Sequence, residues 1–130
     1  MQYSKIFFLK EKYFIEDEII KLQINDDIAK KVANFYNNKP FPNYDDNDNR
    51  QSLLHKGNKN QLTCKFKNHV GFSKNILEVG PGTCQVSIYL AIGTNNQIVV
   101  FAPAQESLKL GQKFAKLNSL TGENKLKDLL

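Results

Sequence analysis

The sequence has no tryptophan, only two cysteines and two histidines, and no long apolar run. No stretch approaches the roughly 18 consecutive apolar residues of a membrane-spanning helix, so no membrane span is expected. Cys64 and Cys84 lie far apart, without the paired spacing of zinc ligands or of a disulfide framework, which favours two reduced thiols. No motif surrounds His55 or His69. The sequence therefore predicts no metal site.

The composition is that of an ordinary globular domain. The 130 residues are 41% apolar and 24% charged, which argues against wholesale disorder and suffices for one domain with a core. The apolar run before Lys10 is too short for a secretion signal, so a cytoplasmic protein is expected. The formal net charge of +5 favours an anionic partner, but the lysines are scattered and an acidic stretch at 45–48 interrupts them. Nucleic-acid binding is therefore not expected. The alternative interpretation of the chain as a basic binding module is supported by its net charge alone.

The N-terminal part, residues 1–72, is predicted to be a mainly helical segment. The apolar cluster within residues 6–15 fits either a hairpin or a helix, since periodicity does not decide between them. One helix is predicted from about Asn25, with Lys30 and Lys31 turned outward, and a weaker one over residues 52–69. The predicted inward residues are Ile28, Val32, Phe35 and Tyr36 in the first helix, and Leu54, Leu62 and Phe66 in the second.

A loop over residues 37–50 joins these two helices. Pro40 and Pro42 prevent the first helix from continuing. Phe41 and Tyr44 lie inside the loop, and a polar loop that keeps two aromatic side chains usually packs them against the domain. We therefore expect a proline- and aromatic-containing loop that contacts the rest of the fold rather than a bare linker.

Residues 73–130 change to the pattern of an α/β fold. Ile76–Val79 and Ile98–Phe101 are short apolar runs that suit buried parallel strands, whose two apolar faces both need covering helices. A glycine turn and a helix starting near Thr83 separate them, and another helix is expected from Pro103–Glu106. The order predicts a βαβα unit with adjacent parallel strands and a right-handed crossover. The last helix is expected to face inward with Leu110, Phe114 and Leu117.

Gly80 and Gly82 follow the first predicted strand, at the position where open parallel sheets bind ligands. Glycine lets a ligand approach the backbone, and the start of a helix offers unpaired N–H groups to negative charge. A glycine turn that only packs the helix on the strand is the simpler alternative.

The run Ile76–Thr83, with Glu78 two residues before Gly80, resembles the first motif of class I S-adenosylmethionine (SAM) methyltransferases. The fingerprint of dinucleotide-binding proteins would instead need a further glycine at the position of Gln85. That fingerprint also has no carboxylate at the end of the strand, where this chain has Glu78. The resemblance covers about residues 33–120, and this part of the chain is similar to a bacterial group of the family. It is carried by Phe35-Tyr36, Pro40-Phe41-Pro42-Asn43-Tyr44, Arg50, Ser52-Leu53, Ser107–Gly111, Phe114 and Asn118.

The resemblance implies a partial Rossmann-like domain over residues 73–130 that binds SAM. Gly80 and Gly82 would lie against the methionine end of the cofactor, with Glu78 directed toward its amino group. Thr83 and Cys84 belong to the same loop, and Ala102 stands at the end of the second strand, where the family binds the ribose. The N-terminal aromatic segment would cover the cofactor or help to shape the acceptor side.

Three departures from the family pattern bear on activity. Cys84 replaces a usual third glycine, and Ala102 replaces the ribose-binding acid, for which Glu106 can substitute only in part. Losing hydrogen bonds to a charged acceptor costs roughly 1.5–3 kcal/mol each, which weakens SAM binding by about tenfold to a hundredfold or more. After Leu120 only residues 121–130 follow, too few for the family's remaining strands.

The sequence thus predicts the cofactor-binding portion of a SAM-dependent methyltransferase-like protein. Half a sheet cannot easily hold donor and acceptor in line, so whether methyl transfer survives is open, and the methyl acceptor is not identified. The alternative is a non-catalytic methyltransferase remnant, or an interaction protein that depends on self-association or on a protein partner.

Overall fold

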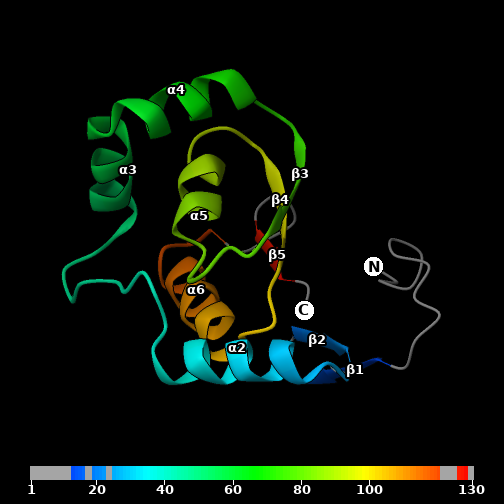
Figure 1. Ribbon diagram of the computed structural model, residues 1–130. Helices are drawn as coiled ribbons and strands as arrows, with labels where there is room; N and C mark the ends of the chain where they lie inside the picture. The colour runs from blue at the N-terminus through cyan, green and yellow to red at the C-terminus, as the bar shows by residue number, and fades with distance from the viewer. Residues whose placement is uncertain (1–12, 17–18, 23–24, 121–125, 129–130) are drawn as a thin grey trace.

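The computed structural model describes residues 13–16, 19–22, 25–120 and 126–128. These residues form a three-stranded parallel sheet, helices packed on it, and a separate two-stranded antiparallel hairpin (Figure 1). The fold is therefore mixed α/β, as the sequence predicts. Within these ranges, no helix is long and apolar enough to cross a membrane.

Strands β3 (Asn75–Val79) and β4 (Gln97–Phe101) lie side by side and parallel, with helix α5 (Gln85–Ala91) between them in the chain. The two predicted strands and the helix that connects them are confirmed. Helix α6 (Gln105–Leu117) follows β4 and leads to β5 (Leu126–Asp128), which pairs parallel with the other edge of β4. For residues 73–130 the sequence predicts only two strands, and none after Leu120. This prediction is wrong, because the second edge of β4 offers a ladder of N–H and C=O groups with which β5 pairs.

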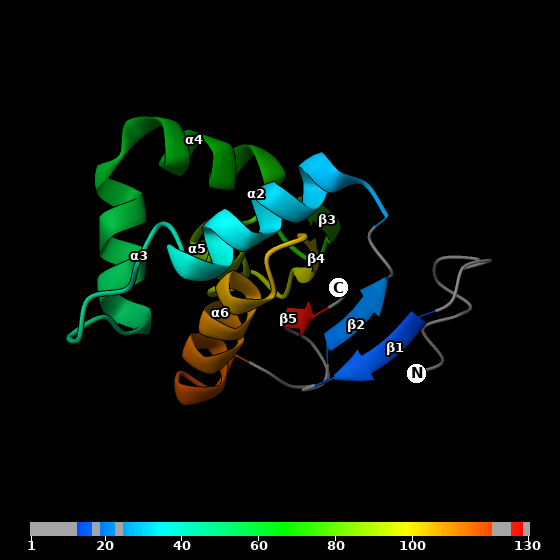
Figure 2. The same ribbon diagram turned by 60° about the horizontal axis from the view of Figure 1, so that its bottom comes forward.

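The N-terminal hairpin consists of β1 (Tyr13–Glu16) and β2 (Ile19–Leu22), which form a sheet of their own (Figure 2). This decides between hairpin and helix for residues 13–15, whereas residues 6–12 of the apolar cluster lie outside the described residues. Ile19 is 1% exposed and belongs to the hydrophobic core.

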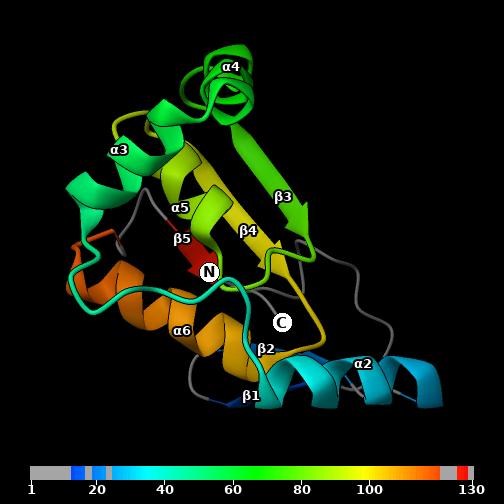
Figure 3. The same ribbon diagram turned by 60° about the vertical axis from the view of Figure 1, so that its left-hand side comes forward.

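Helix α2 (Asp27–Asn38) starts at Asp26, whose carboxylate accepts a hydrogen bond from the Ala29 N–H at 2.6 Å. The helix lies beyond the C-terminal ends of β3 and β4 and packs on α6 (Figure 3). Its buried residue is Ala33, so its predicted inward face is wrong. Because α2 packs through this small side chain, its apolar stripe stays exposed: Ile28 72%, Val32 42%, Phe35 58% and Tyr36 40%.

The helix predicted over residues 52–69 is two helices, α3 (Arg50–Lys59) and α4 (Gln61–Val70). The break is at Asn60, whose extended backbone ends α3 and whose side chain accepts the Thr63 N–H at 3.1 Å to start α4. Gly57 does not interrupt α3. A Cβ at Gly57 would lie 2.3 Å from the ring of Tyr89, so glycine permits the close approach of α3 and α5.

Three further predicted inward residues are exposed. Leu62 and Phe66 on α4 are 78% and 47% exposed, and Leu117 at the end of α6 is 75% exposed. Leu54 packs against the core as predicted, beside the buried Leu53. Helical periodicity places residues on one face of a helix, but α4 contributes no fully buried residue to the described core.

The core lies on one face of the parallel sheet. Ile98 and Val100 of β4 are fully buried there, together with Ile88 of α5 and Leu108 of α6. On the opposite face, Leu77, Val79 and Phe101 are 56%, 70% and 36% exposed. The expectation that helices cover both faces is therefore not met by the residues that the structure describes.

Candidate functional site

The glycine loop, residues 80–84, leads from the C-terminal end of β3 into α5. Gly80, Gly82 and Cys84 have φ values of +74°, +57° and +66°, all in the left-handed region. The Gly80 N–H donates a hydrogen bond of 2.8 Å to the carbonyl of Phe101, the last residue of β4. The loop is therefore fixed at the carboxyl edge of the parallel strands, where α/β folds bind ligands.

The two glycines of this loop border different surroundings. A Cβ at Gly80 would meet no atom within 4 Å, so the space beside Gly80 is open. A Cβ at Gly82 would lie 2.6 Å from the carbonyl oxygen of Phe41. Gly80 therefore leaves room for a ligand, whereas Gly82 leaves room for another part of the chain.

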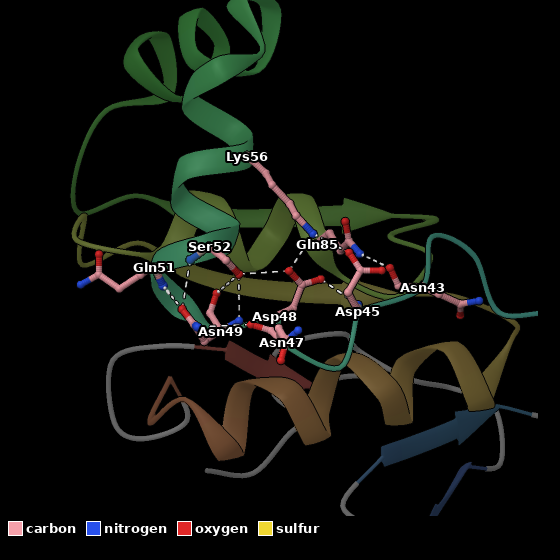
Figure 4. A network of polar contacts seen from close by, with 9 residues as sticks. All are labelled: Asn43, Asp45, Asn47, Asp48, Asn49, Gln51, Ser52, Lys56 and Gln85. Atoms are coloured by element: carbon pink, nitrogen blue, oxygen red, sulfur yellow. Dashed lines mark hydrogen bonds and ion pairs between the residues drawn. The ribbon is translucent and has the colours of Figure 1, made fainter.

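That part of the chain is the strap, which we define as residues 40–44. The Thr83 hydroxyl donates a hydrogen bond to the carbonyl of Pro42, and the Tyr44 hydroxyl donates one of 2.6 Å to the carbonyl of Thr83. The Gln85 side-chain amide donates to the carbonyl of Asn43 at 2.9 Å (Figure 4). The expectation that the loop packs on the domain is confirmed, and its contact is with the glycine loop itself.

Tyr44 anchors the strap. Its ring stacks on Phe114 of α6, with centroids 4.3 Å apart and an interplanar angle of 14°. Burial, helped by Cys84 and Asp48, raises the pKa of the Tyr44 hydroxyl above its ordinary value, so the hydroxyl stays a hydrogen-bond donor. Phe41 is 71% exposed, so the expected packing of both aromatic rings is right for Tyr44 and wrong for Phe41. The backbone of Phe41, and not its ring, contacts the glycine loop.

A polar network joins the end of the strap to α3 (Figure 4). Asn49 caps α3 and forms a reciprocal pair of hydrogen bonds with Ser52. The ammonium of Lys56 lies 2.9 Å from Asp45 and 2.6 Å from Asp48. Burial acts to raise the pKa of Asp48, but hydrogen bonds from Lys56 and from the Asp45 N–H hold it below its ordinary value. The segment that follows the strap, residues 45–49, is thus held at α3, whereas the strap itself is held at the glycine loop.

Glu78 lies on the sheet face that α5 covers. Its carboxylate accepts a hydrogen bond from the hydroxyl of Ser87, which is fully buried in α5. Ser87 therefore orients the acid that precedes the glycines. Sequence reasoning missed Ser87; the available signal was a hydroxyl residue between the apolar positions of the helix that follows the loop.

Thr83 and Cys84 are both fully buried. The Thr83 side chain is used by the strap, and the Cys84 side chain packs against α6, where a Cβ at Gly111 would lie 2.7 Å from the Cys84 sulfur. A non-glycine residue with left-handed backbone costs about 1–2 kcal/mol. This cost gives a physical reason for the glycine that the methyltransferase pattern has at the position of Cys84.

The end of β4 completes the site. Ala102 follows Phe101 and is half-buried. Glu106 pairs with Lys109 at 3.4 Å, and its N–H donates to the Asn37 side chain of α2 at 3.0 Å. In this first turn of α6, two buried polar atoms have no hydrogen-bond partner among the described residues: Gln105 Nε2 and Ser107 Oγ.

The predicted site residues thus gather at the carboxyl edge of β3 and β4: Glu78, Gly80, Gly82, Thr83, Cys84 and Ala102. The part of the chain that the structure describes contains no cluster of three His, Cys, Asp or Glu residues able to hold a metal ion. Comparisons of the chain with protein-family models, with curated proteins and with solved structures gave no match. A functional assignment therefore depends on the geometry of this edge of the sheet.

Proposed function

We propose that the chain binds SAM at the glycine loop, as the cofactor-binding portion of a methyltransferase-like fold. The observation that carries the proposal is the open space beside Gly80, at the junction of a parallel strand and a helix start. A ligand beside Gly80 meets no obstructing Cβ, and the start of a helix after such a loop generally offers backbone N–H groups to a polar ligand. The open side of Gly80, at the end of β3 and beside β4, leaves space for a polar cofactor that spans the ends of these two strands.

The strand order supports a Rossmann-like interpretation of the sheet. The order β5-β4-β3, with all strands parallel, corresponds to the 3-2-1 order in the first half of a doubly wound sheet. In such a sheet the first strand carries the glycine loop, and here that strand is β3. The carboxyl ends of the first two strands then hold the two ends of the cofactor.

SAM is preferred to a dinucleotide for two reasons. Glu78 lies on the strand just before the glycines and is held by Ser87, which suits a cofactor that carries an ammonium group. Gln85 takes the place of the third glycine of a dinucleotide fingerprint, and its side chain is bound to the strap. The absence of a carboxylate at Ala102 leaves the ribose end without its usual partner, so weak binding is expected.

Titration calorimetry of the full chain with SAM and with its demethylated product tests the proposal. We expect weak binding that Ala102→Asp strengthens by about tenfold, because a carboxylate at the end of β4 restores charged hydrogen bonds to the ribose. Ala102→Asn is the matched control, since it adds similar volume without the charge. Tight binding of NAD with no binding of SAM would contradict the proposal.

A second candidate function is that of a non-catalytic, partner-dependent protein. It is favoured by the exposed apolar face formed by Leu77, Val79 and Phe101, because parallel sheets are normally covered on both faces. On this candidate the chain alone has marginal stability or self-associates, and shows no methyl transfer. Sizing chromatography with thermal melting tests the first part, and a methyl-transfer assay against cell extract tests the second. A stable monomer with turnover that Gly80→Val abolishes would refute it.

A further inference from the structure

A cavity of about 620 Å³ that is broadly open to solvent lies between the end of α2 and the strap. Its volume is in the range of small-molecule binding sites. Three aromatic side chains line it, Phe35 and Tyr36 from α2 and Phe41 from the strap. The polar lining comes from Asn38, Lys39 and Asn43. The cofactor contacts proposed at the glycine loop do not include these residues, which belong to the aromatic segment that the resemblance expects to cover the cofactor or to shape the acceptor side.

The aromatic side chains that line the cavity do not belong to the hydrophobic core. Phe35 and Phe41 are 58% and 71% exposed, and Tyr36 is 40% exposed. Phe35 and Tyr36 meet edge to face, with ring centroids 5.2 Å apart at 88°. Rings exposed in this way gain most from contact with another flat ring, which removes apolar surface from water and adds a favourable ring geometry. The lining therefore suits a planar ligand.

The charge of the cavity selects among planar ligands. Of the described residues that line it, Lys39 is the one with a charge. The carbonyl end of α2 contributes roughly half a negative charge, which the full positive charge of Lys39 outweighs. The lining contains no carboxylate that would pair with a cationic ligand such as an ammonium group. An anionic ligand is therefore favoured over a cationic one.

The strap connects this cavity to the glycine loop. The carbonyl of Phe41 lies against Gly82, and the carbonyl of Asn43 is bound by Gln85 in the first turn of α5. A ligand in the cavity therefore contacts residues that also touch the proposed cofactor loop.

We propose that this cavity is a second binding site, for a small aromatic anion such as an aromatic carboxylate. Its role as the position of a methyl acceptor rests on the proposed function, whereas the binding itself does not. The ring lies among Phe35, Tyr36 and Phe41, and the anionic group lies toward Lys39.

Ligand-observed NMR on the full chain tests this with two probes of similar size, 4-hydroxybenzoate and benzylamine. We expect 4-hydroxybenzoate to bind in the low millimolar range, as usual for a fragment-sized ligand, and benzylamine to bind about tenfold more weakly. Lys39→Glu should reverse the preference between the two probes. Phe41→Ala should weaken both probes, whereas Phe66→Ala, which removes an exposed ring from α4, should change neither.

The proposal is overturned if 4-hydroxybenzoate does not bind at about 10 mM, a concentration sufficient for a fragment in a formed site. It is equally overturned if both probes bind alike, or if Lys39→Glu leaves their order unchanged. SAM calorimetry on the same samples keeps the two proposals apart. Probe binding without SAM binding contradicts only the cofactor site, and SAM binding without probe binding contradicts only the aromatic cavity.

Discussion

The substitutions Gly80→Ala and Gly82→Ala test whether the space beside each glycine serves a ligand or the packing of the strap. Both positions have left-handed backbone, so each substitution costs about 1–2 kcal/mol of unfolding free energy. At Gly80 the new Cβ meets no atom within 4 Å, and no further cost arises. At Gly82 the Cβ would lie 2.6 Å from the Phe41 carbonyl, and relief of this clash displaces the strap. Two hydrogen bonds join the strap to Thr83, from the Thr83 hydroxyl to the Pro42 carbonyl and from the Tyr44 hydroxyl to the Thr83 carbonyl. Their loss adds about 1 kcal/mol each, so Gly82→Ala should cost about 3–4 kcal/mol.

Chemical denaturation measures these differences, and calorimetry with SAM measures binding by the variants that remain folded. Gly93→Ala is the matched control, because Gly93 has φ +71° and open surroundings but lies in the turn before β4. Gly80→Ala should be as stable as Gly93→Ala and should bind SAM at least about tenfold more weakly than it. Equal stability losses at Gly80 and Gly82 would refute the packing argument. Unchanged SAM binding by Gly80→Ala would refute the assignment of the open space to the cofactor.

Three further predictions concern the supports of the site. Tyr44→Phe removes a hydroxyl donor but keeps the stacked ring, and thermal denaturation should show a loss of about 1 kcal/mol; unchanged stability would mean that the hydroxyl does not hold the strap. Gly111→Ala should cost about 1–3 kcal/mol through overpacking against Cys84, and less in a Cys84→Gly background; a double-mutant cycle with no coupling would contradict this contact. Because the pKa of Asp48 is lowered in the folded state, its stabilisation is full above its ordinary value of 3.8 and is lost as the pH falls through the lowered pKa. Asp48→Asn should therefore flatten the acid limb of the curve of stability against pH, and an unaltered limb would show that Asp48 is not paired with Lys56.

The strands and helices of residues 75–117 were largely predictable because their signals are local. Two short apolar runs, a glycine turn and a proline before a helical pattern each restrict a few consecutive residues. The break at Asn60 was missed, since asparagine inside a helical pattern does not reveal that its side chain caps the next helix. The strand β5 was missed as well, because strand pairing depends on a partner distant in the sequence.

The sequence by itself determined the order of strands, glycine loop and helices around the candidate site, and so placed Glu78, Gly80 and Gly82 at one edge of a parallel sheet. Periodicity also determined which residues share a face of α2. Only the tertiary structure decided whether that face is covered, because burial requires another element of the chain to lie against it. Likewise, only the fold decided that Gly80 borders open space and Gly82 borders the strap. Their backbone conformations are alike, and the difference comes from Phe41, which is distant in the chain and close in space.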